Sequence, residues 1–436
     1  MRSGRCVGRH LRLNRHVQGG LFWGAFASVC AFPAFAQVLP DAKAELSDAG
    51  LNASLVYDGD IATNAAGGLK RGTVYMGNLH LKLQVEGETL FGQPGLRVFL
   101  DGLGIHGGQA SGLAGDAQGV SNIAAPTQFR LYEAWVQFNT ADGRLSVLAG
   151  QYDLNSEFYR LDSAGLFLNS SFGIGPEFAF SGNDGPSIFP DTSLGLRAGF
   201  KLSDNIVIRA AVLDGVPVHR PEDAAGIFSG DDGLLLAGEM AYLTRPGQRE
   251  PMENMRSLIG RASALAPYDD KIAIGGWYYT AKFPDQSYSG DLEEPTRHHG
   301  TGGLYLLMDA LLYQPQANPD LRVSGFLQAG IGSNRVNRFH SYFGFGLTAT
   351  GLIPDRASDE LGIATAIGGD ASHYVQAQEL AGVPVTSSEI AVEFTYLAQI
   401  ADWLAVQPDV QYVIHPNTDP QIANALVFQL QLEVSL

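Results

Sequence analysis

The sequence predicts an all-β fold, a 16-stranded antiparallel transmembrane β-barrel with long extracellular loops, one of them folded into the pore. Three observations support this prediction. Short stretches alternate apolar and polar residues with period two, and the connections between them are alternately long and short. Beyond the N-terminus, no apolar run approaches the ~20 residues of a membrane-spanning helix.

The N-terminal residues differ from the rest in composition. Five arginines between Arg2 and Arg15 precede an apolar run over residues 21–35, which ends in Ala34-Phe35-Ala36. This pattern predicts a secretory signal peptide over residues 1–36, since the apolar run is short for a retained membrane helix. Both cysteines, Cys6 and Cys30, lie in the predicted signal, so the exported chain is expected to form no disulfide.

After the signal, residues 37–50 are expected to form a short periplasmic segment, and residues 51–436 the barrel. Period-two alternation bounded by Gly, Pro, Asn and Asp defines the candidate strands, each near the 9 to 11 residues of a tilted spanning strand. They cover residues 52–63, 72–85, 95–106, 127–139, 143–152, 192–202, 205–213, 233–244, 270–282, 300–312, 320–332, 339–351, 359–369, 387–399, 402–414 and 422–435.

The last candidate strand has the clearest two faces. Every even position from Leu426 to Leu436 is a large apolar residue, and Gln429, Gln431 and Glu433 alternate with them. Successive side chains of a strand point to opposite faces, so one face is expected to contact lipid and the other the aqueous lumen. A soluble β-sandwich, the alternative, would expose these apolar residues to water.

The connections give an independent indication of a barrel whose two ends lie in the periplasm. Long connections over residues 107–126, 153–191, 214–232, 283–299 and 370–386 alternate with short ones at 140–142, 203–204 and 400–401. The exception is 245–269, which is long where a short turn is expected. Its residues 252–259 resemble a short periplasmic helix.

Connection 153–191 is the longest, and it mixes apolar residues with glycines at 164–168 and 170–176. A loop in contact with solvent would be more polar. We therefore expect it to fold inward and narrow the pore, the alternative being an apolar loop packed on a neighbouring subunit.

The polar side of the alternating strands supplies the candidate pore-lining residues. Cations and carboxylates on one lumen face suit neutral polyols, whose hydroxyls both donate and accept hydrogen bonds. A register slip of one residue would invert any single assignment. The inward set is Lys82, Arg97, Asp101, Arg197, Arg209, Glu239, Arg322, Glu389, Glu393, Gln407, Asp409 and Gln411.

In the strand over residues 131–138, Tyr132, Ala134, Val136 and Phe138 are expected to point outward, and Glu133, Trp135 and Gln137 inward. An inward Trp135 would stack on the apolar face of a pyranose ring, or it belongs to an interfacial aromatic girdle. Trp277 is undecided, since both faces of its strand carry apolar residues.

Other classes of function have less support. The net charge of −17 argues against nucleic acid as a partner, and removal of the signal makes the chain more acidic still. No catalytic or phosphate-binding motif is present, and adjacent His298 and His299 would point apart on an extended chain. We expect no enzyme activity, no cofactor and no metal.

Several stretches resemble the carbohydrate-selective outer-membrane porins of the OprB family. They are YDLNSEF at 152–158, SAGLFLNSSFGIGP at 163–176, GPSIFP at 185–190, GDAQGVSNI at 115–123, LYEAW at 131–135 and QPDVQYVI at 407–414. The resemblance implies a barrel in the outer membrane of a Gram-negative bacterium, with outer-membrane lipid around it and glucose or related sugars as its substrate. Asn155 and Glu157, in the first stretch, complete the candidate pore-lining set.

Two functional alternatives stay open beside facilitated sugar diffusion. One is a general diffusion porin without sugar preference, and the other is a secreted sugar-binding β-sandwich. The sequence leaves the preferred sugar undecided, and a homotrimer or a monomer fits it equally.

Overall fold

The computed structural model describes residues 43, 45–217, 232–244, 268–286 and 295–436 of the chain. The chain divides into two compact units, Met1–Asp48 and Ala49–Leu436. Residues 45–48 of the first unit are helical. The predicted signal peptide over residues 1–36 lies outside the described residues.

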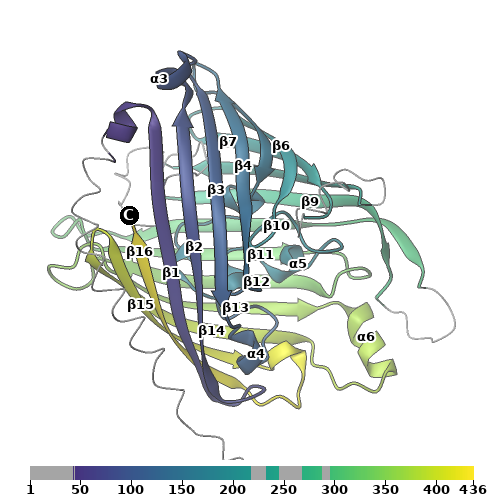
Figure 1. Cartoon of the computed structure of the whole chain (residues 1–436). Coiled ribbons are helices and arrows are strands. Elements are labelled where there is room, and N and C mark those ends of the chain that lie inside the picture. The colour runs from purple at the N-terminus through teal and green to yellow at the C-terminus, as the bar shows by residue number, and fades with distance from the viewer. Residues whose placement is uncertain (1–42, 44, 218–231, 245–267, 287–294) are drawn as a thin grey trace, which may run out of the picture. The chain divides into compact units, whose positions relative to one another are not determined.

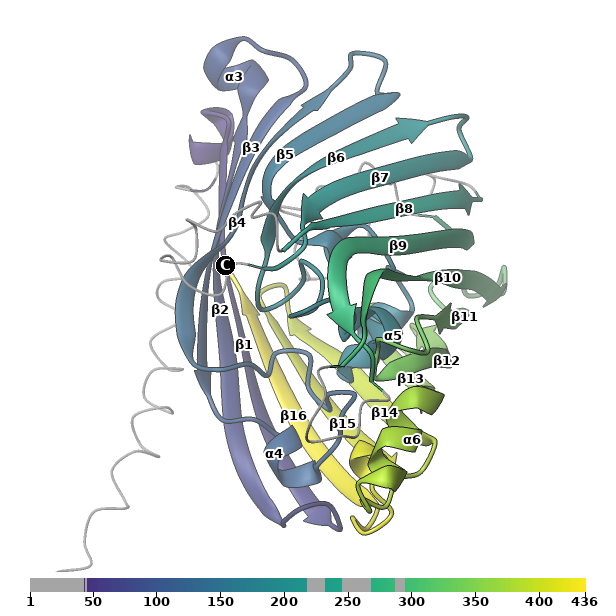
Figure 2. The same cartoon turned by 90° about the vertical axis from the view of Figure 1, so that its right-hand side faces the viewer.

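In the second unit, sixteen described strands form one closed antiparallel barrel, in which each strand pairs with its neighbours in sequence and β1 pairs with β16 (Figures 1 and 2). The predicted fold class is therefore confirmed. The strands are β1 (Leu51–Ala66), β2 (Gly72–Glu86), β3 (Leu96–Gly107), β4 (Gln128–Asn139), β5 (Leu145–Tyr152), β6 (Ser193–Lys201), β7 (Ile206–Asp214), β8 (Leu234–Leu243), β9 (Lys271–Pro284), β10 (Arg297–Tyr313), β11 (Arg322–Ile331), β12 (Phe339–Thr350), β13 (Glu360–Asp370), β14 (Ser388–Ala401), β15 (Leu404–Ile414) and β16 (Ala425–Ser435).

The two faces of the sheet follow the predicted alternation. In β16, Phe428 and Leu430 are exposed on the outside, whereas Gln429 and Gln431 are buried on the inside. Where the sheet closes on itself, the backbones of Leu55 and Leu436 exchange two hydrogen bonds. An apolar outer surface and a polar inner surface are the arrangement that a barrel in a bilayer requires.

Short helices lie in the connections. They are α3 (Gly87–Phe91), α4 (Ser111–Ala114), η1 (Leu154–Ser156), η2 (Ala164–Leu166), η3 (Ser170–Phe172), α5 (Pro176–Ala179), α6 (Ser372–Leu380) and η5 (Pro416–Thr418). Among the described helices, none is long and apolar enough to cross a membrane. The helix expected at 252–259 lies outside the described residues.

The connection between β5 and β6 folds into the barrel, as the sequence predicts, and α5 lies inside the ring of strands in both views (Figures 1 and 2). Inward-facing side chains of distant strands hold it there. Asp309 of β10 accepts a hydrogen bond from the amide of Ser163 at 3.0 Å, and Gln328 of β11 donates to the carbonyl of Phe172 at 2.9 Å. The alternative of a loop packed on a neighbouring subunit is wrong, because backbone groups of the loop form hydrogen bonds with side chains inside its own barrel.

The connection between β3 and β4 also enters the lumen, which the sequence did not indicate. Gln411 of β15 and Gln429 of β16 both donate to the carbonyl of Val120 at 2.8 Å, and Glu389 of β14 accepts from the amides of Ala117 and Gln118. The lumen is thus narrowed by two segments.

One predicted orientation is wrong. Tyr132 was expected to point outward, but it is buried, and its hydroxyl donates to Asp153 at 2.8 Å. The register between β3 and β4 shifts at this point: Asp101 lies opposite Glu133, and Gly102 lies opposite Leu131. This β-bulge turns Tyr132 and Glu133 to the same side, which a strict period of two does not anticipate.

Candidate functional site

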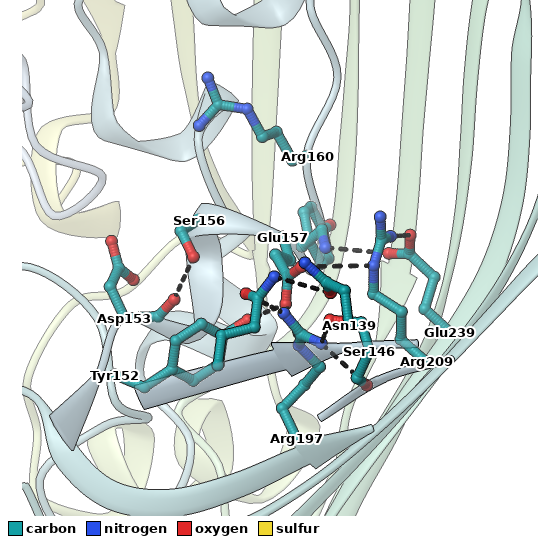
Figure 3. A network of polar contacts seen from close by, with 12 residues as sticks. Asn139, Ser146, Tyr152, Asp153, Ser156, Glu157, Arg160, Arg197, Arg209 and Glu239 are labelled. Carbon is teal, nitrogen blue, oxygen red and sulfur yellow. Dashed lines mark hydrogen bonds and ion pairs between the residues drawn. The ribbon is translucent and has the colours of Figure 1, made fainter. Parts of the chain in front are cut away.

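Charged side chains from four consecutive strands meet on the inner wall of the barrel. Arg197 of β6, Arg209 of β7 and Glu239 of β8 face inward, and Glu157, next to η1, joins them from the inward-folded loop (Figure 3). Lys271 of β9 is paired with Glu239. Arg209 and Glu239 lie directly opposite one another in the ladder between β7 and β8. The four strands therefore bring together residues that are far apart in the sequence.

Arg197 is the most fully bound of these cations. Its Nε lies 2.6 Å from Glu157 Oε2, Nη1 donates to Ser146 Oγ at 2.7 Å, and Nη2 donates to Gln137 Oε1 at 3.1 Å. The residue is 1% exposed. An arginine so enclosed acts as part of the wall, because a buried charge is stable only when it is paired and hydrogen-bonded.

Glu239 connects the remaining cations to the loop. Its Oε1 lies 3.5 Å from Arg209 Nη1 and 3.3 Å from Lys271 Nζ, while Oε2 accepts from the hydroxyl of Tyr305 at 3.0 Å and the amide of Tyr159 at 3.1 Å. Lys271 also donates to the carbonyl of Arg160 at 2.8 Å. This ion network fixes residues 157–160 of the loop against β6 to β9.

A second cluster lies on β2 to β4. Asp101 pairs with His80 at 2.9 Å, and Glu133 accepts a hydrogen bond at 3.1 Å from the amide of Asp153 and another at 3.2 Å from the indole of Trp135. The Trp135 ring is 2% exposed and packs on Phe99, with their ring centroids 5.0 Å apart. Trp135 therefore orients Glu133 and has no free face in this structure.

Two other predicted residues stand outside both clusters. Arg97 pairs with Glu86 at 3.3 Å near the start of β3, where its side chain is well exposed. The side chain of Asn155 donates to the carbonyls of Phe158 and Gly173, which shapes the loop. The predicted set is thus divided between an ion network with Glu157, Arg197, Arg209 and Glu239, a second cluster with Asp101, Glu133 and Trp135, and two separate residues.

The sequence did not single out Lys271, His80 or Arg160. Lys271 begins a strand whose face was undecided because of Trp277, which the structure places inward against Phe178 with ring centroids 4.1 Å apart. His80 lies two positions before Lys82 on the same face of β2, so the alternation already contained this signal. Arg160 lies in a loop, where no periodicity applies.

Exposure distinguishes the polar groups that reach the lumen. Arg209 and Glu239 are each 3% exposed, whereas the side chain of His80 is 17% exposed, and Lys82 and Arg160 are half-buried. Figure 3 shows the guanidinium of Arg160 directed away from the ion network. His80 and Lys82 on β2 and Arg160 on the loop are therefore more accessible than the cations of the ion network.

The loop also contains a carboxyl group among aromatic residues. Glu177 is fully buried, and its Oε1 accepts from the hydroxyl of Tyr159 at 2.9 Å, while its Oε2 has no hydrogen bond. Burial raises the pKa of Glu177 to about 7. Among the described residues, no three His, Cys, Asp or Glu side chains are placed to hold a metal ion.

Residues 70–436 match the model of the carbohydrate-selective porins, OprB family. The chain belongs to this family. It is a porin of the outer membrane that passes carbohydrates, and the family consists of channels.

Solved structures agree in fold. The high-pH structure of Pseudomonas putida OprB aligns with a TM-score of 0.75 at 18% identity, over 91% of this chain and 96% of that chain. The low-pH structure of the same protein gives 0.54 at 14% identity, over 91% and 95%. Salmonella typhi OmpF in complex with daunomycin gives 0.53 at 10% identity, over 89% and 99%. Among curated proteins, no match is found.

Proposed function

We propose that sugars cross the barrel between the inward-folded loop and the wall of β2 to β4, where His80, Lys82 and Arg160 contact their hydroxyl groups. The observation that carries this proposal is the partial exposure of these three side chains, whereas Arg197, Arg209 and Lys271 of the ion network are buried. Sites of this kind bind weakly enough to release the sugar on the far side.

In this proposal, Asp101 and Glu133 hold the accessible side chains in place and do not contact the sugar, since they are 1% and 5% exposed. Both carboxylates lie behind the accessible cations: Asp101 is paired with His80, and Glu133 interacts electrostatically with Lys82. Donors with carboxylates behind them can still hydrogen-bond a neutral polyol, whereas they offer an ion of either sign both attraction and repulsion. This arrangement favours sugar selectivity over general diffusion.

In the same proposal, Arg197, Arg209, Glu157 and Glu239 set the width of the pore by holding the loop, and they do not contact the sugar. Trp135 positions Glu133. Arg97 and Asn155, which were candidates for sugar contact, are assigned to the rim of the barrel and to the shape of the loop. The channel acts without catalysis.

Each chain is proposed to carry its own complete path, since β1 to β16 close the barrel within one chain. A monomer and a homotrimer would then conduct equally per chain. Light scattering of the detergent-solubilised protein measures the oligomeric state, and bilayer recordings measure the conductance per chain.

The test uses the purified protein in planar bilayers and measures the block of ion current by glucose. Arg160→Ala removes an accessible charged donor, and hydrogen bonds to charged groups contribute about 1.5–3 kcal/mol, so the blocking affinity is expected to fall at least about tenfold. The matched control is Arg144→Ala, which removes an exposed cation from the turn between β4 and β5. Equal effects of the two substitutions would contradict the proposed path.

A further inference from the structure

A single aromatic ring of the inward-folded loop is open to water. Phe180 is 52% exposed, whereas Phe172 and Phe178 of the same loop are almost completely buried. The other phenylalanines of the loop are buried or half-buried, so the exposed ring of Phe180 is a local exception. It lies directly after α5, in a connection on the side of the barrel opposite to the turns 140–144 and 202–205.

The ring of Phe180 rests on a fixed base. It packs on Phe339, which is buried at the start of β12, with ring centroids 5.5 Å apart. The guanidinium of Arg338 lies 4.9 Å from the centroid of Phe339 and 5.0 Å from that of Tyr374. Phe180, Arg338, Phe339 and Tyr374 form one surface, which we call the aromatic platform.

An ion pair lies beside the platform. Arg338 Nε and Asp370 Oδ1 are 3.4 Å apart, and the side chain of Asp370 is completely buried, whereas that of Arg338 is 26% exposed. The rest of each group is engaged, since Arg338 Nη2 donates to the carbonyl of Asn417 at 3.1 Å and Asp370 Oδ2 accepts from Thr418 at 2.7 Å. Asp370 and Asn417 thus hold Arg338 in place, and part of its side chain is exposed next to the aromatic rings.

The helix that carries Tyr374 is tied to its neighbours. Ser372 exchanges two hydrogen bonds of 2.7 Å with the side chain of Asn334, and His373 Nδ1 lies 2.9 Å from Asp285. The amide of Ala371 donates to the carbonyl of Arg338 at 2.7 Å. The platform therefore joins three connections, β5–β6, β11–β12 and β13–β14, at the same end of the barrel (Figures 1 and 2).

We propose that the aromatic platform is a docking subsite for a pyranose sugar at the extracellular mouth, occupied before the sugar reaches the pore. The apolar C–H face of the sugar packs on the exposed ring of Phe180, and its hydroxyls accept hydrogen bonds from Arg338. An aromatic face with a charged donor at its edge matches a ring that is apolar on its faces and polar at its rim. The inference rests on the proposed function.

The experiment measures the rate at which glucose enters a single channel of known orientation, from each side of the bilayer in turn. Phe180→Ala is expected to lower the entry rate from the extracellular side about three- to tenfold, since an aromatic contact is worth ~0.5–1.5 kcal/mol. Entry from the periplasmic side does not pass the platform first and should be unchanged. Phe180→Trp keeps an aromatic face and should retain the extracellular entry rate.

The matched control is Phe129→Ala, which removes an exposed phenylalanine from the outer surface of β4 and should change neither rate. Heat-modifiable migration on a gel verifies that each variant forms a barrel. An unchanged extracellular rate in Phe180→Ala, or an equal fall from both sides, overturns the subsite while block of the unsubstituted channel still supports the proposed function. Absence of any glucose block in the unsubstituted channel overturns both.

Discussion

Replacing Glu157 by glutamine is expected to destabilise the barrel strongly, because the ion network would lose one of its two carboxylates. The side chain of Glu157 is 1% exposed and lies 2.6 Å from Arg197 and 3.7 Å from Arg209. It also accepts a hydrogen bond from Tyr152 at 2.6 Å. Glutamine has the same shape, but its amide group would place a donor against donors, and Arg197, Arg209 and Lys271 would face Glu239 as the remaining carboxylate.

Removing one partner of a buried ion pair costs about 3–5 kcal/mol, since the other charge stays buried without compensation. Equilibrium unfolding in urea with lipid vesicles measures this loss. The same substitution releases residues 157–160 from the wall, so a larger single-channel conductance is expected alongside the lower stability. The two effects share one cause and should appear together.

A double-mutant cycle with Arg197→Gln tests the pairing itself. If Glu157 and Arg197 stabilise one another, the second substitution costs much less than the first, and the coupling energy is at least ~2 kcal/mol. Two losses that simply add, to within about 0.5 kcal/mol, would refute the assignment of this pair as the anchor of the loop.

Two further substitutions test other parts of the structure. Burial raises the pKa of Glu177 from its usual 4.5 to about 7, so the folded state loses stability relative to the unfolded state as the pH rises through this interval. Glu177→Gln should therefore stabilise the protein by about 3 kcal/mol at pH 8 and have little effect at pH 4, and a gain independent of pH would contradict the argument. Leu430→Arg, on the outer face of β16, should cost ~2–4 kcal/mol in lipid vesicles if this position lies near the middle of the bilayer, whereas Leu430→Ala should cost less; equal losses would place Leu430 away from lipid.

Periodicity in the sequence was sufficient to predict the barrel and the side to which most charged residues point. Arg197 and Arg209 alternate with apolar neighbours, and both prove to face inward. The alternation of long and short connections indicated which connections lie at the same end of the barrel. The apolar composition of residues 164–176 indicated a loop inside the barrel. These features depend only on local chemistry, which a single sequence contains.

The sequence could not reveal how the inward-facing residues divide along the depth of the pore. Arg97 and Asp101 share a face of β3, yet Arg97 lies near its start with Glu86 and Asp101 lies with His80. The orientation of Tyr132 was predicted wrongly because a β-bulge adds one residue to its strand. The orientation of Trp277 was left undecided because glycines and aromatic residues occupy both faces of β9. The contacts that an inward-facing residue makes across the lumen depend on how the barrel closes and on the path of the loop.

The inward-facing acidic residues have a structural role that the sequence alone did not indicate. Glu389, Glu393 and Asp409 were expected to line the lumen beside the arginines, but Glu393 accepts hydrogen bonds from the amides of Leu168 at 2.6 Å and Asn169 at 3.0 Å. Glu389 does the same for the connection between β3 and β4, and Glu239 for Tyr159.

Carboxylates on the strands thus repeatedly bind backbone N–H groups of the two segments that enter the lumen. A loop inside a barrel must satisfy its amides without a sheet of its own, and an inward carboxylate offers two acceptor oxygens at a fixed position on a rigid strand. The same side chains cannot also be free to exchange partners with a passing sugar. The acidic residues of β8 and β14 therefore shape the two segments inside the lumen, and we propose that contact with the sugar is left to the less buried groups on β2 and on the loop.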